Sequence, residues 1–297
     1  MHWPVILTAM ITPFASDGSL SEERAQELAG WLVANGSDGL VVAGTTGESP
    51  TLSQEERMRL LKAARAGAGS APVWMGCGTN STTDTIANAR DAEKWGADGI
   101  LLVTPYYNRP PQEGLYQHFV QVANAVSCPV MIYNVPGRTG VSLAPETMAR
   151  IIAECRNVQA VKESSGTLEA IWAMRENCPG LKVYAGDDAL FYPSLAIGAQ
   201  GIVSVAAHLV GPLMVRLAEA YQRGRVDEAR ALHQSLLPLV RELFSWPNPI
   251  PVKWAVNRLG FAAGPLRLPL VYPTDPNAFD RLDQLITALA VSPIKPR

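Results

Sequence analysis

The chain has 297 residues, a formal net charge of -2 and only 18% charged residues. Because the charges nearly balance, there is no electrostatic basis for binding nucleic acid or an anionic membrane surface. No apolar run is long enough to cross a bilayer, and the apolar first residues lack the basic segment of a signal peptide. Four scattered cysteines without a CxxC pair are typical of reduced thiols. We therefore expect a cytoplasmic globular protein.

Short apolar, β-branched runs alternate with amphipathic helical patterns along the first two thirds of the chain. The eight runs lie at residues 5–10, 40–43, 73–75, 100–103, 130–133, 158–161, 183–185 and 202–205. This alternation indicates a parallel sheet covered by helices, and eight units favour a closed (β/α)8 TIM barrel of the α/β class. Beyond residue 212 only helical patterns follow, at 213–222, 226–243, 251–259 and 276–289. We predict a barrel at 1–210 and a C-terminal helical extension packed on it at 211–297.

Only one lysine is expected at the catalytic face of this barrel. TIM-barrel enzymes carry their chemistry at the carboxyl ends of the strands, and Lys162 follows the sixth predicted strand. The other lysines fall in charged helices, at strand or helix starts, or in the tail: Lys62, Lys94, Lys182, Lys253 and Lys295. A partly desolvated lysine is a usable amine nucleophile, although a side chain that extends to solvent is the alternative. We therefore predict that Lys162 is the amine nucleophile of the site.

Polar residues follow three further predicted strands. The GTTGE motif after the second strand contains Thr45 and Thr46, which can hold a carboxylate or relay a proton. Tyr107 follows the fourth strand and Tyr133 ends the fifth, and a phenol there can exchange a proton. Arg138, in the next loop, can bind a carboxylate through two parallel hydrogen bonds. The structural alternatives are a turn with a helix cap, tyrosines packed in the core or an interface, and a surface arginine.

The GDD motif at residues 186–188 raises the question of a metal site. The four histidines do not cluster after strands, and no spacing of His, Asp and Glu resembles a metal site. We expect Asp188 to cap the next helix, Asp187 to bond nearby backbone and the isolated His208 to be structural.

Taken in order, these motifs resemble the dihydrodipicolinate synthase family. The matching segments span nearly the whole chain: GTTGE at 44–48, TPYYN at 104–108, YNVPGRTG at 133–140, VKE at 161–163, GDD at 186–188 and NPIPVK at 248–253. The resemblance implies a carbon–carbon lyase, 4-hydroxy-tetrahydrodipicolinate synthase, that condenses pyruvate with L-aspartate 4-semialdehyde in diaminopimelate and lysine biosynthesis. Pyruvate and the semialdehyde are the expected partners, and no metal or organic cofactor is required.

The resemblance assigns the catalytic roles to four residues. By it, Lys162 forms the Schiff base and Tyr133 is the proton donor, while Thr45 and Tyr107 complete a proton relay with Tyr133. In such enzymes the tyrosine at the position of Tyr107 reaches into the site of a neighbouring subunit. The resemblance therefore implies a homotetramer, a dimer of dimers.

The resemblance also implies four substrate-binding residues. Thr46 and Val203 match pyruvate-binding positions, Gly186 stands with them among the substrate-binding residues, and Arg138 matches the residue that binds the carboxylate of the semialdehyde.

One departure from the family concerns feedback inhibition by lysine. Lysine-inhibited members often carry histidines in the helix after the GES motif, where Gln54 and Arg57 stand in this chain. Ser49, Asn80 and Tyr106 match other positions of that regulatory cleft. We expect inhibition by lysine to be weak or absent.

Two alternative functions remain open from the sequence. An N-acetylneuraminate lyase or another pyruvate-dependent sugar-acid aldolase would keep Lys162, Tyr133 and the GTTGE loop, although Arg138 favours the semialdehyde. A non-catalytic barrel that binds a keto acid is the alternative of a different class, because a fold alone does not imply catalysis. The intact set of Lys162, Tyr133, Thr45 and Tyr107 speaks against it.

Overall fold

Within residues 3–294, which the computed structural model describes, eight strands follow one another in a closed barrel in chain order. They are β1 (Ile6–Ala9), β2 (Gly39–Val42), β3 (Val73–Gly76), β4 (Gly99–Val103), β5 (Val130–Asn134), β6 (Val158–Glu163), β7 (Lys182–Ala185) and β8 (Gly201–Ser204). Neighbouring strands pair in parallel wherever their register is defined. This closed order confirms the predicted (β/α)8 barrel. The strands are four to six residues long and nearly all of their residues are buried, as is typical of parallel strands covered by helices.

Helices separate the strands and continue after the last one. They are α1 (Glu22–Ala34), α2 (Gln54–Ala68), α3 (Thr82–Lys94), α4 (Gln112–Ala123), α5 (Pro136–Thr139), α6 (Pro145–Glu154), α7 (Leu168–Asn177), α8 (Phe191–Ala196), α9 (Ala207–Gln222), α10 (Val226–Leu243), α11 (Ile250–Arg258) and α12 (Asp280–Ala288), with short 3₁₀ turns η1 (Ser49–Thr51) and η2 (Asp188–Leu190). The predicted C-terminal helices are present. No helix among the described residues has the length and apolarity needed to span a membrane.

Helices α9, α5 and α12 differ from the sequence prediction. Helix α9 begins before Pro212 rather than after it, because non-helical dihedrals at Val210 kink the chain and accommodate the proline ring. The four-residue helix α5 was not predicted, since so short a segment has no periodicity. Helix α12 begins at Asp280, later than the predicted residue 276.

The chain divides into two compact units. The first contains the residues up to Val5 together with Pro72–Val203, and it carries β3 to β7 with α3 to α8. The second contains Ile6–Ala71 and the residues from Ser204 onward, so the C-terminal helices share a unit with β1 and β2. The predicted division of the chain near residue 210 stays a proposal.

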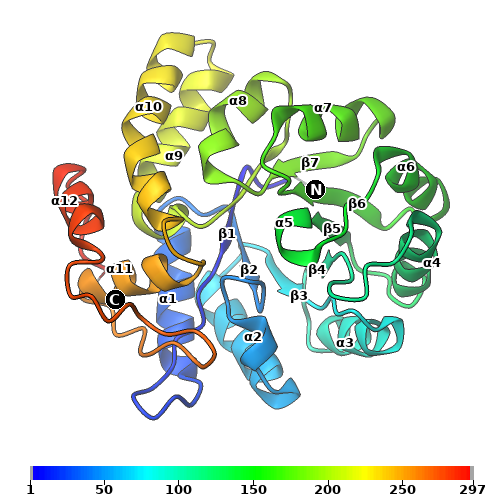
Figure 1. The fold of residues 1–297 in the computed structure, drawn as a ribbon, viewed down its shortest axis with the longest axis horizontal. Helices are drawn as coiled ribbons and strands as arrows, with labels where there is room; N and C mark the ends of the chain where they lie inside the picture. Colours follow the sequence, from blue (N-terminus) through cyan, green and yellow to red (C-terminus); the bar gives the residue numbers. More distant parts are fainter. Residues whose placement is uncertain (1–2, 295–297) are drawn as a thin grey trace. The chain divides into compact units, whose positions relative to one another are not determined.

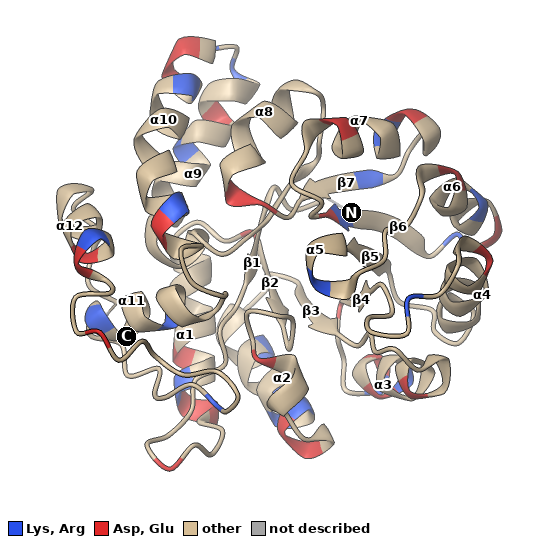
Figure 2. Ribbon diagram, in the orientation of Figure 1, with Lys and Arg blue, Asp and Glu red and all other residues tan. Residues whose placement is uncertain are grey.

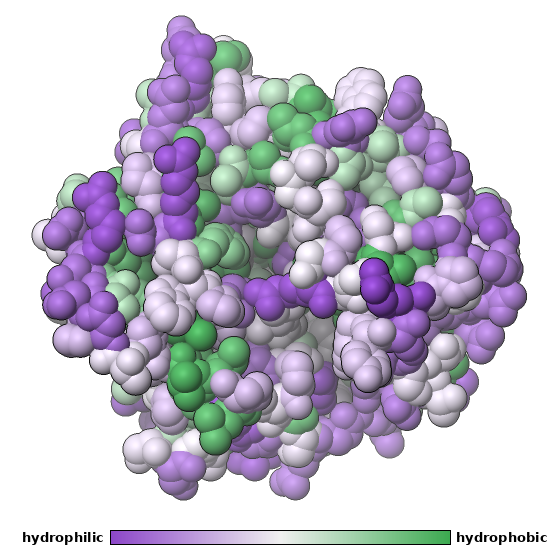
Figure 3. Space-filling model, in the orientation of Figure 1, coloured by the Kyte–Doolittle hydropathy of each residue, from purple (hydrophilic) through white to green (hydrophobic). Residues whose placement is uncertain are grey.

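In the first unit the strands form the apolar interior and the helices carry the charges. All residues of β5 are buried, and Leu101 and Leu102 of β4 lie beside them. Figure 1 shows α3, α4, α6 and α7 along the outer side of these strands. Charged residues lie mainly on such helices in Figure 2, and Figure 3 shows hydrophilic side chains along the flank formed by α4 and α6. The interior of this unit is therefore apolar, and its charged side chains lie mainly on the outer helices.

His208 is fully buried in the second unit and is bonded to two backbone groups. Its Nε2 accepts a hydrogen bond from the N–H of Ile11 at 3.2 Å, and its Nδ1 donates to the carbonyl oxygen of Val205 at 2.9 Å. These partners fix the neutral ring with its proton on Nδ1. Burial lowers the pKa of His208 to about 4. The contacts are those of a structural histidine, as the sequence predicts.

The buried His208 makes the stability of the protein depend on pH. Because its pKa falls from 6.5 to about 4 on folding, the unfolded chain takes up a proton in this window and the folded chain does not. Stability is thus fully present above pH 6.5 and is lost as the pH falls toward 4. Between pH 7 and 4.5, the free energy of unfolding should fall by roughly 2–3 kcal/mol more in the wild type than in His208→Gln. Urea titrations at both pH values measure this, and an equal fall in the two proteins would contradict the assignment.

Candidate active site

Lys162 and Tyr133 lie side by side on neighbouring strands. In the parallel pairing of β5 with β6, Tyr133 stands opposite Lys162, and this register places both side chains on the same face of the sheet. The Nζ of Lys162 lies 4.4 Å from the centroid of the Tyr133 ring, and each residue is only 6% exposed. Strand β6 extends to Glu163, so Lys162 lies within the strand rather than just beyond it. The structure brings the two predicted central residues together.

A buried polar pair ties the ends of these two strands. The amide Nδ2 of Asn134 donates to the Oε2 of Glu163 at 2.8 Å, and the other carboxylate oxygen accepts from the backbone N–H of Ser165 at 2.8 Å. Asn134 and Glu163 each follow a site residue and stand opposite each other in the register, so they point to the other face of the sheet. This pair fixes the positions of Tyr133 and Lys162. The sequence analysis did not identify it, although two polar residues at adjacent strand ends were the available signal.

Gly186 lies against the Lys162 side chain. Its N–H donates to the carbonyl oxygen of Glu163 at 2.8 Å, which brings the backbone after β7 to the end of β6. A Cβ atom at this position would lie 2.8 Å from Cε of Lys162 and 1.7 Å from Oγ of Ser164. Any larger residue here would have to displace the Ser164 and Lys162 side chains. The buried Oγ of Ser164 has no hydrogen-bond partner among the described residues, so it can bind a ligand beside Lys162. The sequence analysis missed Ser164, and its hydroxyl directly after the VKE motif was the signal.

We expect Gly186→Ala to reduce activity strongly in a protein that still folds. The new methyl group must displace the Ser164 hydroxyl and the end of the Lys162 side chain, and misplacement of a reacting group by about 1 Å costs on the order of 10²-fold in rate. Turnover and thermal unfolding of both proteins measure the effect. Gly137→Ala is the matched control, because nothing lies within 4 Å of a Cβ atom there. Wild-type turnover in Gly186→Ala would show that the contact with Lys162 is unimportant.

The other predicted residues of the first unit differ in exposure. Arg138 is exposed on α5, which begins at Pro136 directly after β5. Tyr107 is 88% exposed and has a φ of 71°, an uncommon backbone conformation for a bulky residue. Val203 is fully buried in β8. Arg138 and Tyr107 therefore lie at the surface, outside the buried Lys162–Tyr133 pair.

Thr45 and Thr46 belong to the second unit, in a tight loop after β2. The N–H groups of Gly47 and Glu48 donate to the carbonyl oxygens of Gly44 and Thr45, both at 3.1 Å. Thr46 is 2% exposed, and its Oγ1 accepts a hydrogen bond from Nδ2 of Asn248 at 2.9 Å. Thr45 is half-buried. The loop is thus a rigid turn that carries two hydroxyl groups.

The second unit contains another buried lysine, Lys253. Its Nζ forms an ion pair with Oε1 of Glu48 at 2.7 Å and donates to the carbonyl oxygen of Thr12 at 2.9 Å. Burial lowers the pKa of Lys253 to about 8, while the Glu48 carboxylate opposes that fall. An ammonium held by an anion and a carbonyl is not free to attack a ketone. Lys253 is therefore not a candidate nucleophile, and the role of Lys162 stays a prediction.

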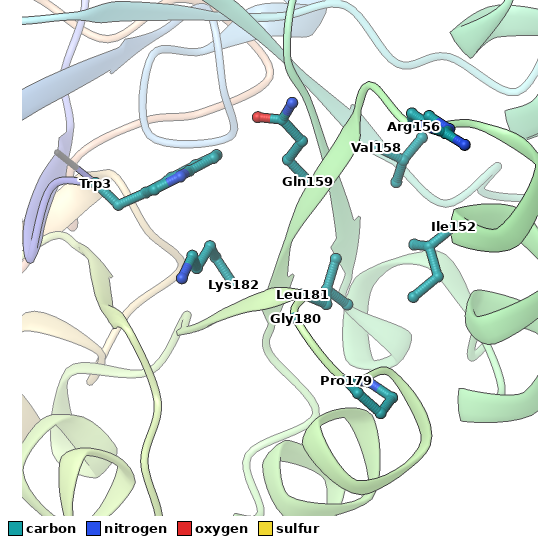
Figure 4. Close-up of a pocket in the computed structure, with 9 residues that line it drawn as sticks. All are labelled: Trp3, Ile152, Arg156, Val158, Gln159, Pro179, Gly180, Leu181 and Lys182. Carbon is teal, nitrogen blue, oxygen red and sulfur yellow. The ribbon is translucent and has the colours of Figure 1, made fainter. Parts of the chain in front are cut away.

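A surface hollow of about 370 Å³ lies at the amino-terminal ends of β6 and β7, away from the carboxyl ends. Figure 4 shows Trp3 and Lys182 across this hollow from Arg156 and Ile152. Lys182 pairs with Ala160 at the start of β7, as the sequence predicts. None of the predicted site residues lines this hollow. The candidate active site is therefore located by the buried Lys162 and Tyr133 side chains and not by the hollow.

Three further sequence expectations concern the η2 cap, a metal site and the regulatory cleft. Asp187, not Asp188, caps η2, because its Oδ1 accepts from the N–H of Ala189 at 3.0 Å. Among the described residues, no group of three or more His, Cys, Asp or Glu is arranged to hold a metal ion. Arg57 donates to both the carbonyl oxygen and the hydroxyl of Ser49, at 3.0 and 2.5 Å. The Ser49 position of the expected regulatory cleft is thus bonded within the chain, and weak lysine inhibition stays an expectation.

Comparison with known proteins gives one consistent result. Residues 3–289 match the model of the dihydrodipicolinate synthetase family. The chain is 50% identical over 276 residues to a 4-hydroxy-tetrahydrodipicolinate synthase of Moorella thermoacetica (92% of this chain, 94% of the relative). It is 49% identical over 277 residues to that of Bacillus subtilis (93% and 96%). A crystal structure of the Cyanidioschyzon merolae enzyme with lysine bound superposes with a TM-score of 0.93 at 41% identity, covering 96% of this chain and 98% of the other.

Proposed function

Since the chain belongs to the dihydrodipicolinate synthetase family, we propose that it acts as a 4-hydroxy-tetrahydrodipicolinate synthase through a Schiff base on Lys162. The observation that carries this proposal is the buried Lys162 amine, 4.4 Å from the Tyr133 ring at the end of β6. A reactive amine beside a phenol is the pair of groups that imine chemistry on a keto acid requires.

In the reaction the Lys162 amine is first the nucleophile and finally the leaving group. The amine attacks the ketone carbon of pyruvate, and loss of water gives an iminium ion that acidifies the methyl group. Loss of a methyl proton gives an enamine, whose carbon attacks the aldehyde carbon of L-aspartate 4-semialdehyde. The amino group of the semialdehyde then displaces Lys162 and closes the ring. Protons move at each of these steps, and we assign their transfer to Tyr133 with Thr45 and Tyr107.

The remaining assigned residues bind the two substrates. Thr46, Val203 and Gly186 are assigned to pyruvate, and the exposed guanidinium of Arg138 is assigned to the carboxylate of the semialdehyde. The steric fit of Gly186 against Lys162 supports its role. The alternative, a sugar-acid aldolase of the same chemistry, differs in the aldehyde, so comparing turnover of the semialdehyde with that of N-acetylmannosamine separates the two.

We expect Lys162→Ala to lower turnover of pyruvate and semialdehyde by more than about 10³-fold without unfolding the protein, because no other group replaces the nucleophile. The matched control is Lys182→Ala, a lysine on the neighbouring strand at the opposite strand end. It should keep turnover within about threefold of the wild type, as a residue away from the chemistry does. Similar losses in both variants, or turnover surviving in Lys162→Ala, would reject the proposal.

The assembled protein is proposed to be a homotetramer, a dimer of dimers, located in the cytoplasm. A tyrosine with 88% of its surface exposed and a positive φ is costly in an isolated chain, and burial in a partner's site offsets that cost. All four cysteines are free, which fits a reducing compartment. Tyr107 then contributes its hydroxyl to the proton relay of the neighbouring subunit.

Mixing two inactive variants tests this arrangement. In a dimer of Tyr107→Phe with Lys162→Ala, a tyrosine that acts across the interface leaves one site with both wild-type groups. Random subunit exchange should restore about one quarter of wild-type activity, because half of the dimers are mixed and each has one complete site. A tyrosine that acts within its own chain would restore nothing, so activity that stays at the mean of the two variants contradicts the proposal.

A further inference from the structure

We propose that Asn248 is a positioning residue that directs the Thr46 hydroxyl toward the carboxylate of the keto acid. This inference rests on the proposed function, in which Thr46 binds pyruvate. It extends the substrate-binding machinery to the C-terminal segment that contains Asn248 and α11.

The hydrogen bond between Asn248 and Thr46 has a defined direction. Nδ2 of Asn248 lies 2.9 Å from Oγ1 of Thr46, and both residues are buried, at 7% and 2% exposure. An amide nitrogen only donates, so it occupies an acceptor lone pair of the hydroxyl. The single O–H proton of Thr46 is then available for another acceptor. A hydroxyl that must donate binds a carboxylate, whereas one free to rotate binds either a donor or an acceptor.

The same C-terminal segment contacts the loop a second time. Lys253, on the first turns of α11, pairs with Glu48 at 2.7 Å, with both side chains fully buried. Glu48 also accepts from the backbone N–H of Arg267 through its other oxygen at 2.9 Å. Asn248 and Lys253 therefore hold Thr46 and Glu48, two residues apart in the loop, from one segment about 200 positions later in the chain.

This second contact holds the backbone of the loop that carries Thr46, so the Asn248 amide meets a loop of fixed position. Glu48 has a φ of 53°, a left-handed conformation that a non-glycine residue keeps only when its surroundings hold it. The ion pair and the Thr12 hydroxyl, which donates to the carbonyl oxygen of Gly47 at 2.6 Å, supply that support. With the loop backbone held, the hydrogen bond from the Asn248 amide sets the direction of the Thr46 hydroxyl, which is the role of a residue that tunes binding.

The test compares Asn248→Asp with Asn257→Asp in the full chain. Aspartate is the same shape as asparagine but accepts the Thr46 proton and adds a negative charge. Asn248→Asp should therefore weaken pyruvate binding, by titration calorimetry without semialdehyde, by about 10- to 100-fold, the size expected for one hydrogen bond to a charged group. The KM for pyruvate should rise equally, the KM for semialdehyde should stay within about twofold, and kcat should fall less than the pyruvate affinity.

Asn257 is the matched control because it lies on α11, the helix that follows Asn248, where its amide donates to the carbonyl oxygen of Gly264 at 3.1 Å. Asn257→Asp loses a comparable hydrogen bond and should keep wild-type pyruvate affinity. A folded Asn248→Asp protein with wild-type affinity for pyruvate overturns the inference. A wild type that binds pyruvate without turnover counts against the proposed function alone, while the binding comparison still decides the role of Asn248.

A second pair of variants covers the case in which Asn248→Asp does not fold. Asn248→Ala removes the donor without adding charge, and it should weaken pyruvate binding by about fivefold or more in the wild-type background. In a Thr46→Ala background it should have no further effect, because the hydroxyl on which it acts is already gone. An equal loss in both backgrounds means that Asn248 acts by another route, and it would overturn the inference.

Discussion

The register of β5 on β6 is the constraint on which the active site depends. Because side chains alternate along a strand, one register places Tyr133 beside Lys162 on one face and Asn134 beside Glu163 on the other. The first pair carries the proposed chemistry, and the second is a buried hydrogen bond that opposes any slip. A shift by one residue would remove both pairs at once. Helix α5, which carries Arg138, follows β5, and Gly186 after β7 is bonded to the carbonyl oxygen of Glu163 at the end of β6.

The contacts of two buried lysines lead us to infer that desolvation alone does not make a lysine a nucleophile. Lys253 is completely buried, and burial lowers its pKa to about 8, yet the Glu48 carboxylate and a carbonyl oxygen hold its ammonium. Lys162 is also buried, but it faces an aromatic ring and a glycine rather than an anion. The difference lies in the partners: an ion pair stabilises the protonated form and consumes its donors, whereas a ring face and open backbone leave the amine accessible to a ligand.

The sequence predicted the barrel and the central pair, because both follow from short-range patterns. Eight apolar runs between helices define the topology, and position along a strand is enough to place Lys162 at the catalytic end. The supporting contacts were not predictable in the same way. The bond from Asn248 to Thr46 joins positions 202 residues apart, and the clash that reserves position 186 for glycine depends on the Ser164 and Lys162 rotamers. Short-range patterns also misplaced the η2 cap by one residue and missed the four-residue helix that carries Arg138.

The central claim is that Lys162, and no other lysine, forms the covalent bond to the keto acid. Reduction with borohydride in the presence of pyruvate converts such an imine into a stable secondary amine, which peptide mass mapping then locates. The structure predicts one adduct per chain, on the peptide that contains Lys162, with Lys253 unmodified. An adduct on another lysine, or no adduct under conditions in which the protein turns over pyruvate, would contradict it.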